Sequence, residues 1–301
     1  MTVPRRELTE LYAKYDLHPG LFDIYVEGDF DYDFLNLFLT NSDITNASVF
    51  SIDDIELPSD LVRGIGLDEG SNKHRVLTLA HLLDQRYAAR NTNQTCLSDP
   101  DRDRALGTLR NYHHATYTDY TCLEAYLLCS STIERFLTFA CQLPAATVAE
   151  FLGIANTVLP VQFVLRAAVE VLGINRPILG FESGLVNKRN LNSFNGDKYL
   201  NSFLAHYALQ RSRDAIIEKM QEIQLGLPND LRHCVQGHDF VSLLFEFVWA
   251  KGSLKLQDKE ESAVKFGGRL LAMSYIHAQL SAEPLFARIV SSASGNTFMR
   301  P

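Results

Sequence analysis

The sequence predicts an α/β protein whose parallel sheet is flanked by helices and is followed by a mainly helical second half. In the first 130 residues, short apolar runs of strand length alternate with stretches of helical spacing. Such alternation is typical of parallel sheets with right-handed crossover connections. After Ser130, long amphipathic segments replace the alternation. The 301 residues allow one large domain or two ordinary ones, with a substantial core.

The chain opens with a predicted helix, a strand, a second helix and a second strand. Apolar residues recur at helical spacing over 5–15, and Pro19-Gly20 ends this helix. Residues 21–26 form an apolar run that indicates a buried strand. Residues 30–39 again have helical spacing, and residues 47–52 indicate the second strand. The apolar side of the second helix is expected to face the core through Phe34, Leu35, Phe38 and Leu39.

The next part of the chain continues the alternation. A glycine-containing loop over 64–73 precedes a predicted helix over 75–90. Residues 95–98 indicate a short strand that leads into Asp99. Residues 106–114 indicate a helix or turn, and residues 115–117 a further short strand. Four strands separated by helices complete the predicted sheet.

The second half is expected to be a helical domain, residues 136–301, after a catalytic domain that spans residues 1–135. A polar break lies near 180–201 and a loose tail at 295–301. We expect the helical domain to carry dimer and partner contacts, with aromatic residues near Trp249 as candidates. Its predicted amphipathic segments are 132–142, 145–157, 160–173, 199–223, 239–251 and 262–280.

Composition indicates an ordinary globular protein of the cytoplasm. Hydrophobic residues make up 46% and charged residues 21% of the chain. No apolar run reaches the ~18 residues typical of a membrane helix, and the N-terminal residues lack the apolar core of a secretory signal. The cysteines form no C-x-x-C pair, which predicts reduced thiols and argues against zinc. These five cysteines are Cys96, Cys122, Cys129, Cys141 and Cys234.

The net charge of −8 is concentrated at the start of the chain. Residues 1–60 contain 13 acidic and 3 basic residues, so they carry −10, and the remaining residues carry +2. A protein that coats nucleic acid without selectivity has a broad basic surface. The charge therefore argues against that class, although acidic residues around bound cations give a different local picture.

Three carboxylates predict a site for a divalent metal ion. Glu27 ends the first predicted strand, and Asp99 and Asp101 leave a later one. In open α/β sheets, ligands bind at the carboxyl ends of the strands. Residues i and i+2 of an extended chain point to the same side, so both aspartates are expected to face one ion. Hard oxygen ligands suit Mg²⁺ or Mn²⁺, and two such ions can promote phosphodiester cleavage.

Four further aspartates lie close to these carboxylates in the sequence. Asp31 stands one helical turn after Glu27 and could reach a second ion. Asp29 and Asp33 are better explained as acids at a helix N-terminus, where the helix dipole favours them. Asp103 either belongs to the metal site or caps the helix that follows.

Several segments together resemble a Toprim domain, which occurs in topoisomerases, primases and OLD-type nucleases. They are Tyr25–Leu35, Ser71–Leu77 and Asp99–Asp103, and the resemblance covers about residues 20–130. Thr118–Leu128 is similar to a further motif of the OLD-like branch, in which a glutamate ends the pattern T-D-x-x-x-x-E. Val235–Phe240 is similar to a G-K-D segment of that branch, with histidine in place of lysine.

The resemblance implies a role for each matching acid. Glu27 matches the invariant glutamate of the Toprim motif, and Asp99 and Asp101 match its D-x-D. Asp31 matches an acid that serves the second metal ion in OLD nucleases, and Glu124 matches the late glutamate.

Basic residues outside the acidic motifs have alternative roles. His238 is either a general acid or base that can also touch phosphate, or a structural histidine. Residues 73–75 either contact phosphate at a helix start or form a solvated first turn. Lys188 and Arg189 either supply a cation against developing charge or contact nothing.

The arrangement as a whole resembles the Toprim effectors of PARIS-type anti-phage defence systems. The resemblance implies a toxic endoribonuclease that cleaves tRNA, held inactive by an ABC-type ATPase and dimeric after release. One alternative is an OLD-type DNA nuclease, and another is an inactive Toprim scaffold that binds a partner. The intact set of Glu27, Asp99 and Asp101 favours an active enzyme. A primase is disfavoured because no zinc motif is present.

Overall fold

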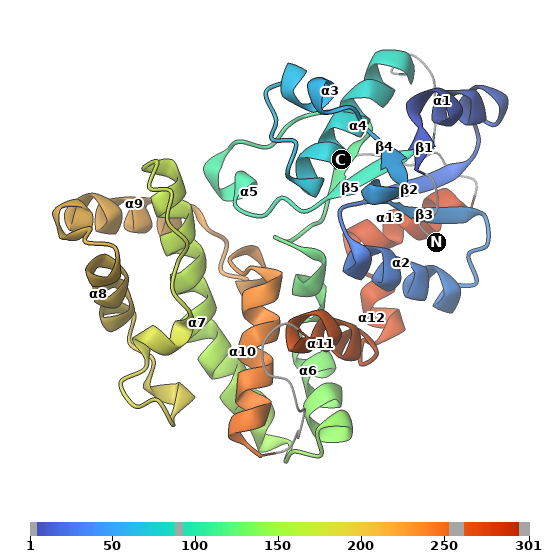
Figure 1. The fold of residues 1–301 in the computed structure, drawn as a ribbon. Coiled ribbons are helices and arrows are strands. Elements are labelled where there is room, and N and C mark those ends of the chain that lie inside the picture. The colour runs from blue at the N-terminus through green and yellow to red at the C-terminus, as the bar shows by residue number, and fades with distance from the viewer. Residues whose placement is uncertain (1–4, 88–92, 253–261, 295–301) are drawn as a thin grey trace. The chain divides into compact units, whose positions relative to one another are not determined.

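The chain forms two compact units in the computed structural model (Figure 1). The structure describes residues 5–87, 93–252 and 262–294, without the side chains of 262–266. Within these limits the sheet unit is drawn from Met1–Asp99, Arg110–Asp119 and Ile276–Pro301, and the helical unit from Pro100–Leu109 and Tyr120–Tyr275. This division differs from the predicted boundary near 135, because the chain passes between the units several times.

The sheet unit is built on a four-stranded, fully parallel sheet in the order β3-β2-β5-β6. These strands are β2 (Phe22–Val26), β3 (Ala47–Ser51), β5 (Thr95–Ser98) and β6 (Ala115–Tyr117). The predicted parallel α/β arrangement is therefore confirmed. A second parallel pair, β1 (Arg6–Glu7) with β4 (Ile55–Glu56), was not predicted. Two residues per strand are too few to produce a recognisable alternation.

Helices cover both faces of the four-stranded sheet, as parallel sheets require. On one face, α1 (Leu8–Leu17) and α4 (Asn72–Tyr87) bury residues such as Tyr15 and Leu83 against Tyr25. On the other face lies α2 (Asp29–Asn41), whose residues Phe34, Leu35, Phe38 and Leu39 are buried as predicted. The short helix α3 (Ser59–Gly64) precedes α4 and was not predicted.

The C-terminal helices complete this second face of the sheet unit. Phe286 of α13 (Pro284–Ala293) packs on Phe34 and Phe38, with ring centroids 6.0 and 4.6 Å apart. His277, at the start of α12 (His277–Ser281), lies 5.4 Å from the Phe38 ring. Figure 1 shows α2 and α13 side by side. The sequence pattern did not predict that residues so late in the chain join the first domain.

Asp119 fixes the start of α13. Its Oδ2 accepts a hydrogen bond from the backbone N–H of Leu285 at 2.8 Å, and Arg288 lies 3.5 Å from its Oδ1. A carboxylate at a helix N-terminus satisfies an otherwise unpaired N–H and is favoured by the helix dipole. The T-D-x-x-x-x-E motif thus contributes a structural contact through its aspartate.

The helical unit is arranged around α7 (Ala146–Val171), a 26-residue helix at its centre (Figure 1). The sequence predicted two amphipathic segments here, 145–157 and 160–173, and Pro160 lies at the start of the second. The structure has one continuous helix, although an interior proline removes a backbone hydrogen bond and typically costs about 3 kcal/mol. Burial of Leu159 and Phe163 beside the proline offsets that cost.

The other helices of this unit pack on α7 or on α10. They are α5 (Asp103–Leu106), α6 (Ser130–Arg135), α8 (Gly196–His206), α9 (Arg213–Gly226), α10 (Gly237–Ala250), α11 (Ser262–Ala272) and the 3₁₀ turn η2 (Leu123–Leu127). The single predicted segment 199–223 is thus two helices, α8 and α9. A π-helical turn, Phe136–Ala140, extends α6.

The aromatic residues near Trp249 belong to the core and not to a contact surface. Phe245 and Phe247 are 1% exposed. Phe245 packs on Phe136 and Phe247 on Phe151, with ring centroids 5.8 and 5.4 Å apart. Of the two roles that the sequence indicated for the two phenylalanines, core or interface, the structure shows the core. That the helical unit carries dimer and partner contacts stays a prediction.

One described helix is long and apolar enough to cross a membrane. This helix is α7, which is not one continuous apolar run in the sequence. Half of its most apolar stretch is buried inside the protein, and the core helix of a soluble protein can have the same length and composition. Its length and composition are therefore weak evidence for a membrane span.

Candidate active site

Glu27 lies at the carboxyl end of β2, next to the end of β5. Its Oε1 accepts hydrogen bonds from Ser98 Oγ at 2.5 Å and from the backbone N–H of Asp99 at 3.0 Å. These contacts form because β2 and β5 are parallel neighbours, so their carboxyl ends meet. The carboxylate is thereby held in a fixed orientation at the sheet edge.

Asp99 is held by the next strand. Thr118, which follows β6 and is buried, donates a hydrogen bond from Oγ1 to Asp99 Oδ1 at 3.3 Å. Glu27, Asp99 and Thr118 therefore come from three adjacent strands, β2, β5 and β6. The sheet unit alone brings together two of the predicted metal ligands. Thr118 and Ser98 support them through their hydroxyl groups, although no sequence pattern predicts that role for either residue.

Asp31 has a structural contact at the start of α2. Its Oδ2 accepts a hydrogen bond from the backbone N–H of Gly28 at 3.2 Å, which caps the helix. Asp29 and Asp33 are exposed on the same helix. Asp29 lies in the first turn, in agreement with the interpretation that the helix dipole favours it, but Asp33 lies beyond the first turn. The predicted metal role of Asp31 remains a prediction beside this cap.

Arg75 stabilises the loop after β3. Its guanidinium contacts Asp53 Oδ1 at 2.5 Å and the backbone oxygens of Ile52 and Ile55 at 3.1 Å each. Asn72 Oδ1 accepts a further hydrogen bond from it at 3.0 Å. These bonds engage most of its donors in the fold, which favours a structural role for Arg75 over contact with phosphate.

Asp101 lies in the helical unit, with a left-handed backbone at φ 46°. The chain leaves the extended conformation at Ser98, so the argument that Asp99 and Asp101 point the same way along a strand does not apply. Aspartate is among the residues that tolerate this conformation. The backbone N–H of Asp101 donates to Thr121 O at 3.0 Å, and its Oδ1 accepts from Gln236 Nε2 at 3.4 Å.

Asp103 stands in the first turn of α5. Its Oδ1 accepts a hydrogen bond from Thr108 Oγ1 at 2.8 Å. This contact is not a helix cap, because the N-cap residue of α5 is Arg102 and no side chain caps the helix. The predicted role of Asp103 as a metal ligand stays a prediction.

Glu124 of η2 lies directly against Gly237, the first residue of α10. A Cβ added at Gly237 would stand 2.3 Å from Glu124 Oε2 and 2.4 Å from its Cδ. The φ of Gly237 is not positive, so the glycine is needed for space and not for backbone freedom. The two segments that resembled motifs of OLD-like nucleases therefore meet at this contact.

Burial raises the pKa of the Glu124 carboxyl above its ordinary value. Hydrogen bonds and the proximity of His238 act in the opposite direction, and the carboxylate of Asp101 raises the pKa further. Asp101 and His238 thus both lie close enough to Glu124 to act on its carboxyl electrostatically. Perturbed carboxyls of this kind are typical of functional sites.

We expect Glu124→Gln to stabilise the protein at neutral pH. When folding raises the pKa of a carboxyl, the free energy of unfolding of the protein decreases as pH rises from the unfolded pKa of about 4.3 toward the folded value. An amide of the same shape removes that cost. Urea denaturation between pH 4 and 8 should show a gain over wild type at pH 7 that shrinks toward pH 4.

The control for this experiment is Glu134→Gln, because Glu134 is exposed on α6. A surface substitution of this kind should change the stability by less than about 0.5 kcal/mol at every pH. A loss of stability at pH 7 in Glu124→Gln would contradict the prediction, since it would mean that the carboxylate forms favourable contacts that outweigh its burial.

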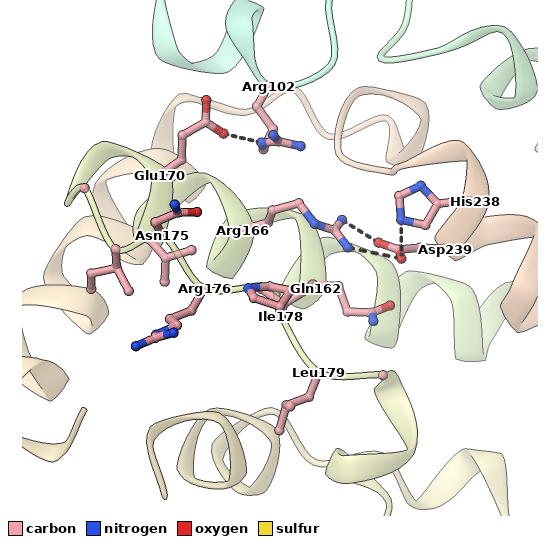
Figure 2. Close-up of a pocket in the computed structure, with 15 residues that line it drawn as sticks. Arg102, Gln162, Arg166, Glu170, Asn175, Arg176, Ile178, Leu179, His238 and Asp239 are labelled. Atoms are coloured by element: carbon pink, nitrogen blue, oxygen red, sulfur yellow. Dashed lines mark hydrogen bonds and ion pairs between the residues drawn. The ribbon is translucent and has the colours of Figure 1, made fainter. Parts of the chain in front are cut away.

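His238 and Asp239 form an ion-pair network with Arg166 of α7. His238 Nε2 lies 3.1 Å from Asp239 Oδ1, and Arg166 reaches both Asp239 oxygens, at 2.6 and 3.2 Å (Figure 2). Burial alone would raise the pKa of Asp239, but the hydrogen bonds from His238 and Arg166 outweigh it and hold the pKa below its ordinary value. Gln236 accepts from Arg166 at 2.5 Å and from Arg102 at 3.0 Å.

Arg166 and Gln236 were not among the sequence-predicted residues. A signal for Arg166 was present, because Gln162, Arg166 and Glu170 recur every four residues in the otherwise apolar stretch 158–171. Polar residues at that spacing line one face of a helix. Gln236 directly precedes the G-H-D segment. Nothing in the sequence indicated a role for it, because a glutamine amide is not a typical acid, base or metal ligand.

The carboxylates fit a hard divalent ion by their chemistry. In residues 5–87, 93–252 and 262–294, no three His, Cys, Asp or Glu side chains gather in a group that could hold a metal ion. Glu27 and Asp99, oxygen donors from adjacent strands, are the residues of the sheet unit that would hold Mg²⁺ or Mn²⁺. A comparison with protein-family models and with curated protein sequences found no match to this chain.

Proposed function

We propose that the chain is a metal-dependent phosphodiesterase of Toprim type, acting as an endoribonuclease. The observation that supports this best is the carboxylate of Glu27 at the carboxyl edge of a parallel sheet. There it is fixed by Ser98 and by the backbone of Asp99. A role in folding alone does not require a carboxylate at this edge, which is where α/β proteins bind their ligands.

In this proposal, each residue has a distinct task. Glu27 and Asp99 hold Mg²⁺ or Mn²⁺. Asp101 keeps the role of metal ligand that the resemblance to the D-x-D motif implies. A bound ion would lower the pKa of a water molecule and stabilise the departing oxygen. Glu124, whose pKa burial raises above its ordinary value, is the first candidate for proton transfer. His238 is the second candidate for proton transfer, and it is 58% exposed.

We further propose that the enzyme is the toxic effector of a cytoplasmic anti-phage defence system. The support is the sequence resemblance to AriB, the effector of the PARIS system. In that arrangement an AriA-like ABC-type ATPase holds the nuclease inactive, and the released effector forms a homodimer and cleaves tRNA. The chain lacks the basic excess of a non-selective nucleic-acid coat, since its net charge is −8. This favours recognition of a structured RNA with an exposed loop.

The test incubates the purified chain with total tRNA and, separately, with linear duplex DNA. We expect cleavage of tRNA in Mg²⁺ or Mn²⁺, and none in excess chelator. The reason is that the metal ion stabilises the negative charge that develops on the phosphate oxygens, which negatively charged carboxylates cannot do. Cleavage of DNA with intact tRNA would instead support an OLD-type DNA nuclease. Full RNA cleavage in chelator would rule out metal-dependent chemistry, and no cleavage of either substrate would favour an inactive scaffold.

A further inference from the structure

A pocket of about 830 Å³ is lined entirely by residues of the helical unit (Figure 2). One wall is the polar stripe of α7, formed by Gln162, Arg166 and Glu170. The loop 173–180 lines another side, and His238 and Asp239 at the start of α10 line a third. The volume is within the range of ~300–1,000 Å³ typical of pockets for small organic ligands.

The pocket has a positive balance of charge in a chain that is acidic as a whole. Three arginines line it, Arg102, Arg166 and Arg176, against the two carboxylates of Glu170 and Asp239. This leaves +1 with His238 neutral and +2 with His238 protonated. Such a local excess of guanidinium groups favours an anionic ligand, and guanidinium suits phosphate oxygens in particular.

Two of these arginines are fixed in place and the third is available. Arg102 Nε contacts Glu170 Oε2 at 2.6 Å, and Arg166 is paired with Asp239. Arg176 is exposed, and its guanidinium lies 5.7 Å from the centre of the Tyr207 ring. Its backbone N–H donates to Ile174 O at 2.9 Å, but its side chain makes no hydrogen bond or ion pair with another described residue. The guanidinium N–H groups can therefore bind a ligand without first breaking a hydrogen bond or an ion pair.

Gln162 supplies an unsatisfied acceptor to the pocket. The residue is 3% exposed, and its Oε1 has no hydrogen-bond partner among the described residues. Its amide also hydrogen-bonds the Tyr199 hydroxyl, which donates to Leu179 O at 2.5 Å. Tyr199 therefore accepts from the N–H₂ group of Gln162, which leaves the carbonyl for a ligand. A buried acceptor without a partner costs about 1–3 kcal/mol, which a donor on a ligand would recover.

We propose that this pocket binds a nucleoside phosphate. The ligand must carry an anionic group for the arginines and a hydrogen-bond donor for Gln162 Oε1. It must also carry an apolar, planar part for the wall formed by Ile174, Pro177 and Ile178. A nucleotide has all three features: phosphate, the N–H groups of its base, and the faces of the base. Inorganic phosphate lacks the last two, and it would fill only a small part of the volume.

The nucleotide can be a free metabolite or one unit of an RNA strand, and both present the same chemistry. If it belongs to RNA, the pocket deepens the proposed nuclease function by holding one nucleotide of the substrate. If it is free, the pocket is a ligand site that does not require RNA. Binding is measured in chelator, so its outcome does not depend on whether the chain cleaves RNA.

The experiment is calorimetric titration of the full-length chain with nucleoside 5′-monophosphates, with the matching nucleosides and with inorganic phosphate. We expect at least one monophosphate to bind about tenfold or more tightly than its nucleoside or phosphate alone. Arg176→Ala should weaken that binding about three- to tenfold, because one charged contact is lost. Gln162→Met, of similar shape, should weaken it to a similar extent.

The matched control is Arg211→Ala, since Arg211 is an exposed arginine of the same unit that does not line the pocket. Its affinity should equal that of wild type, as should that of Glu27→Ala. Competition by a short single-stranded RNA would identify the source as RNA, and binding without competition would identify a free nucleotide. Monophosphate binding that is absent, or that is unchanged in Arg176→Ala and Gln162→Met, would overturn the proposal.

Discussion

Replacing Glu27 with alanine is expected to abolish RNA cleavage and the toxicity of the chain while leaving its fold intact. The substitution removes a carboxylate that would bind metal, and with it the acceptor of the bonds from Ser98 and Asp99. Substitutions that only support metal ligands typically cost about 10–100-fold. Loss of a ligand itself should therefore reduce cleavage by at least about 100-fold. The measurement is the rate of tRNA cleavage in Mg²⁺, with circular dichroism as the check on folding.

Two further variants separate the chemical role of Glu27 from its position. Asp33→Ala removes the same charge from an exposed site on α2 and should cleave at the wild-type rate. Glu27→Gln keeps an acceptor for Ser98 but not the negative charge, so it should also be inactive. Undiminished cleavage by folded Glu27→Ala would contradict the proposed mechanism. Normal activity in Glu27→Gln would show that the hydrogen bonds, and not the charge, are what matters.

Replacing Asp239 with alanine is expected to be the most destabilising of the substitutions considered. Arg166 and Asp239 are 18% and 12% exposed, so the pair is largely buried. Removal of one partner leaves the other charge without compensation, and such losses typically cost about 3–5 kcal/mol. Urea denaturation at pH 7 should show a decrease of this size. Asp214→Ala, at an exposed position on α9, should cost less than about 1 kcal/mol.

The pH dependence of this effect is opposite to that of Glu124→Gln. The pKa of Asp239 is lowered by folding, so its contribution to stability is present above the ordinary carboxyl pKa and disappears as pH falls through the folded value. The difference between wild type and Asp239→Ala should therefore be largest at neutral pH and narrow below about pH 4. A difference that stayed constant down to pH 2 would show that packing, and not charge, is responsible.

These two carboxylates illustrate how the helical unit balances stability against function. Asp239 is buried with an arginine that compensates its charge, and it contributes to stability. Glu124 is buried against Gly237 with less compensation, and its ionised form reduces stability. An acid retained at a cost is more readily explained by a role in chemistry than by a role in folding.

The amino-acid sequence by itself determined the sheet and the position of its first acid. Strands β2, β3, β5 and β6 were predicted within one residue at each end, because each is a short apolar run bounded by turn residues. The inward face of α2 was predicted for the same reason. Glu27 could be placed at a strand end because the apolar run Ile24–Val26 stops there, directly before Glu27 and Gly28.

Only the tertiary structure decided which distant segments meet. The packing of α13 on α2 depends on Asp119 and Phe286, which are far apart in the chain, and no local period encodes their contact. The space that Gly237 leaves for Glu124 and the pairing of Arg166 with Asp239 are of the same kind. Periodicity reports which side of an element is buried. It does not report the partner, because that choice depends on the fit and charge of surfaces that come together only in the folded chain.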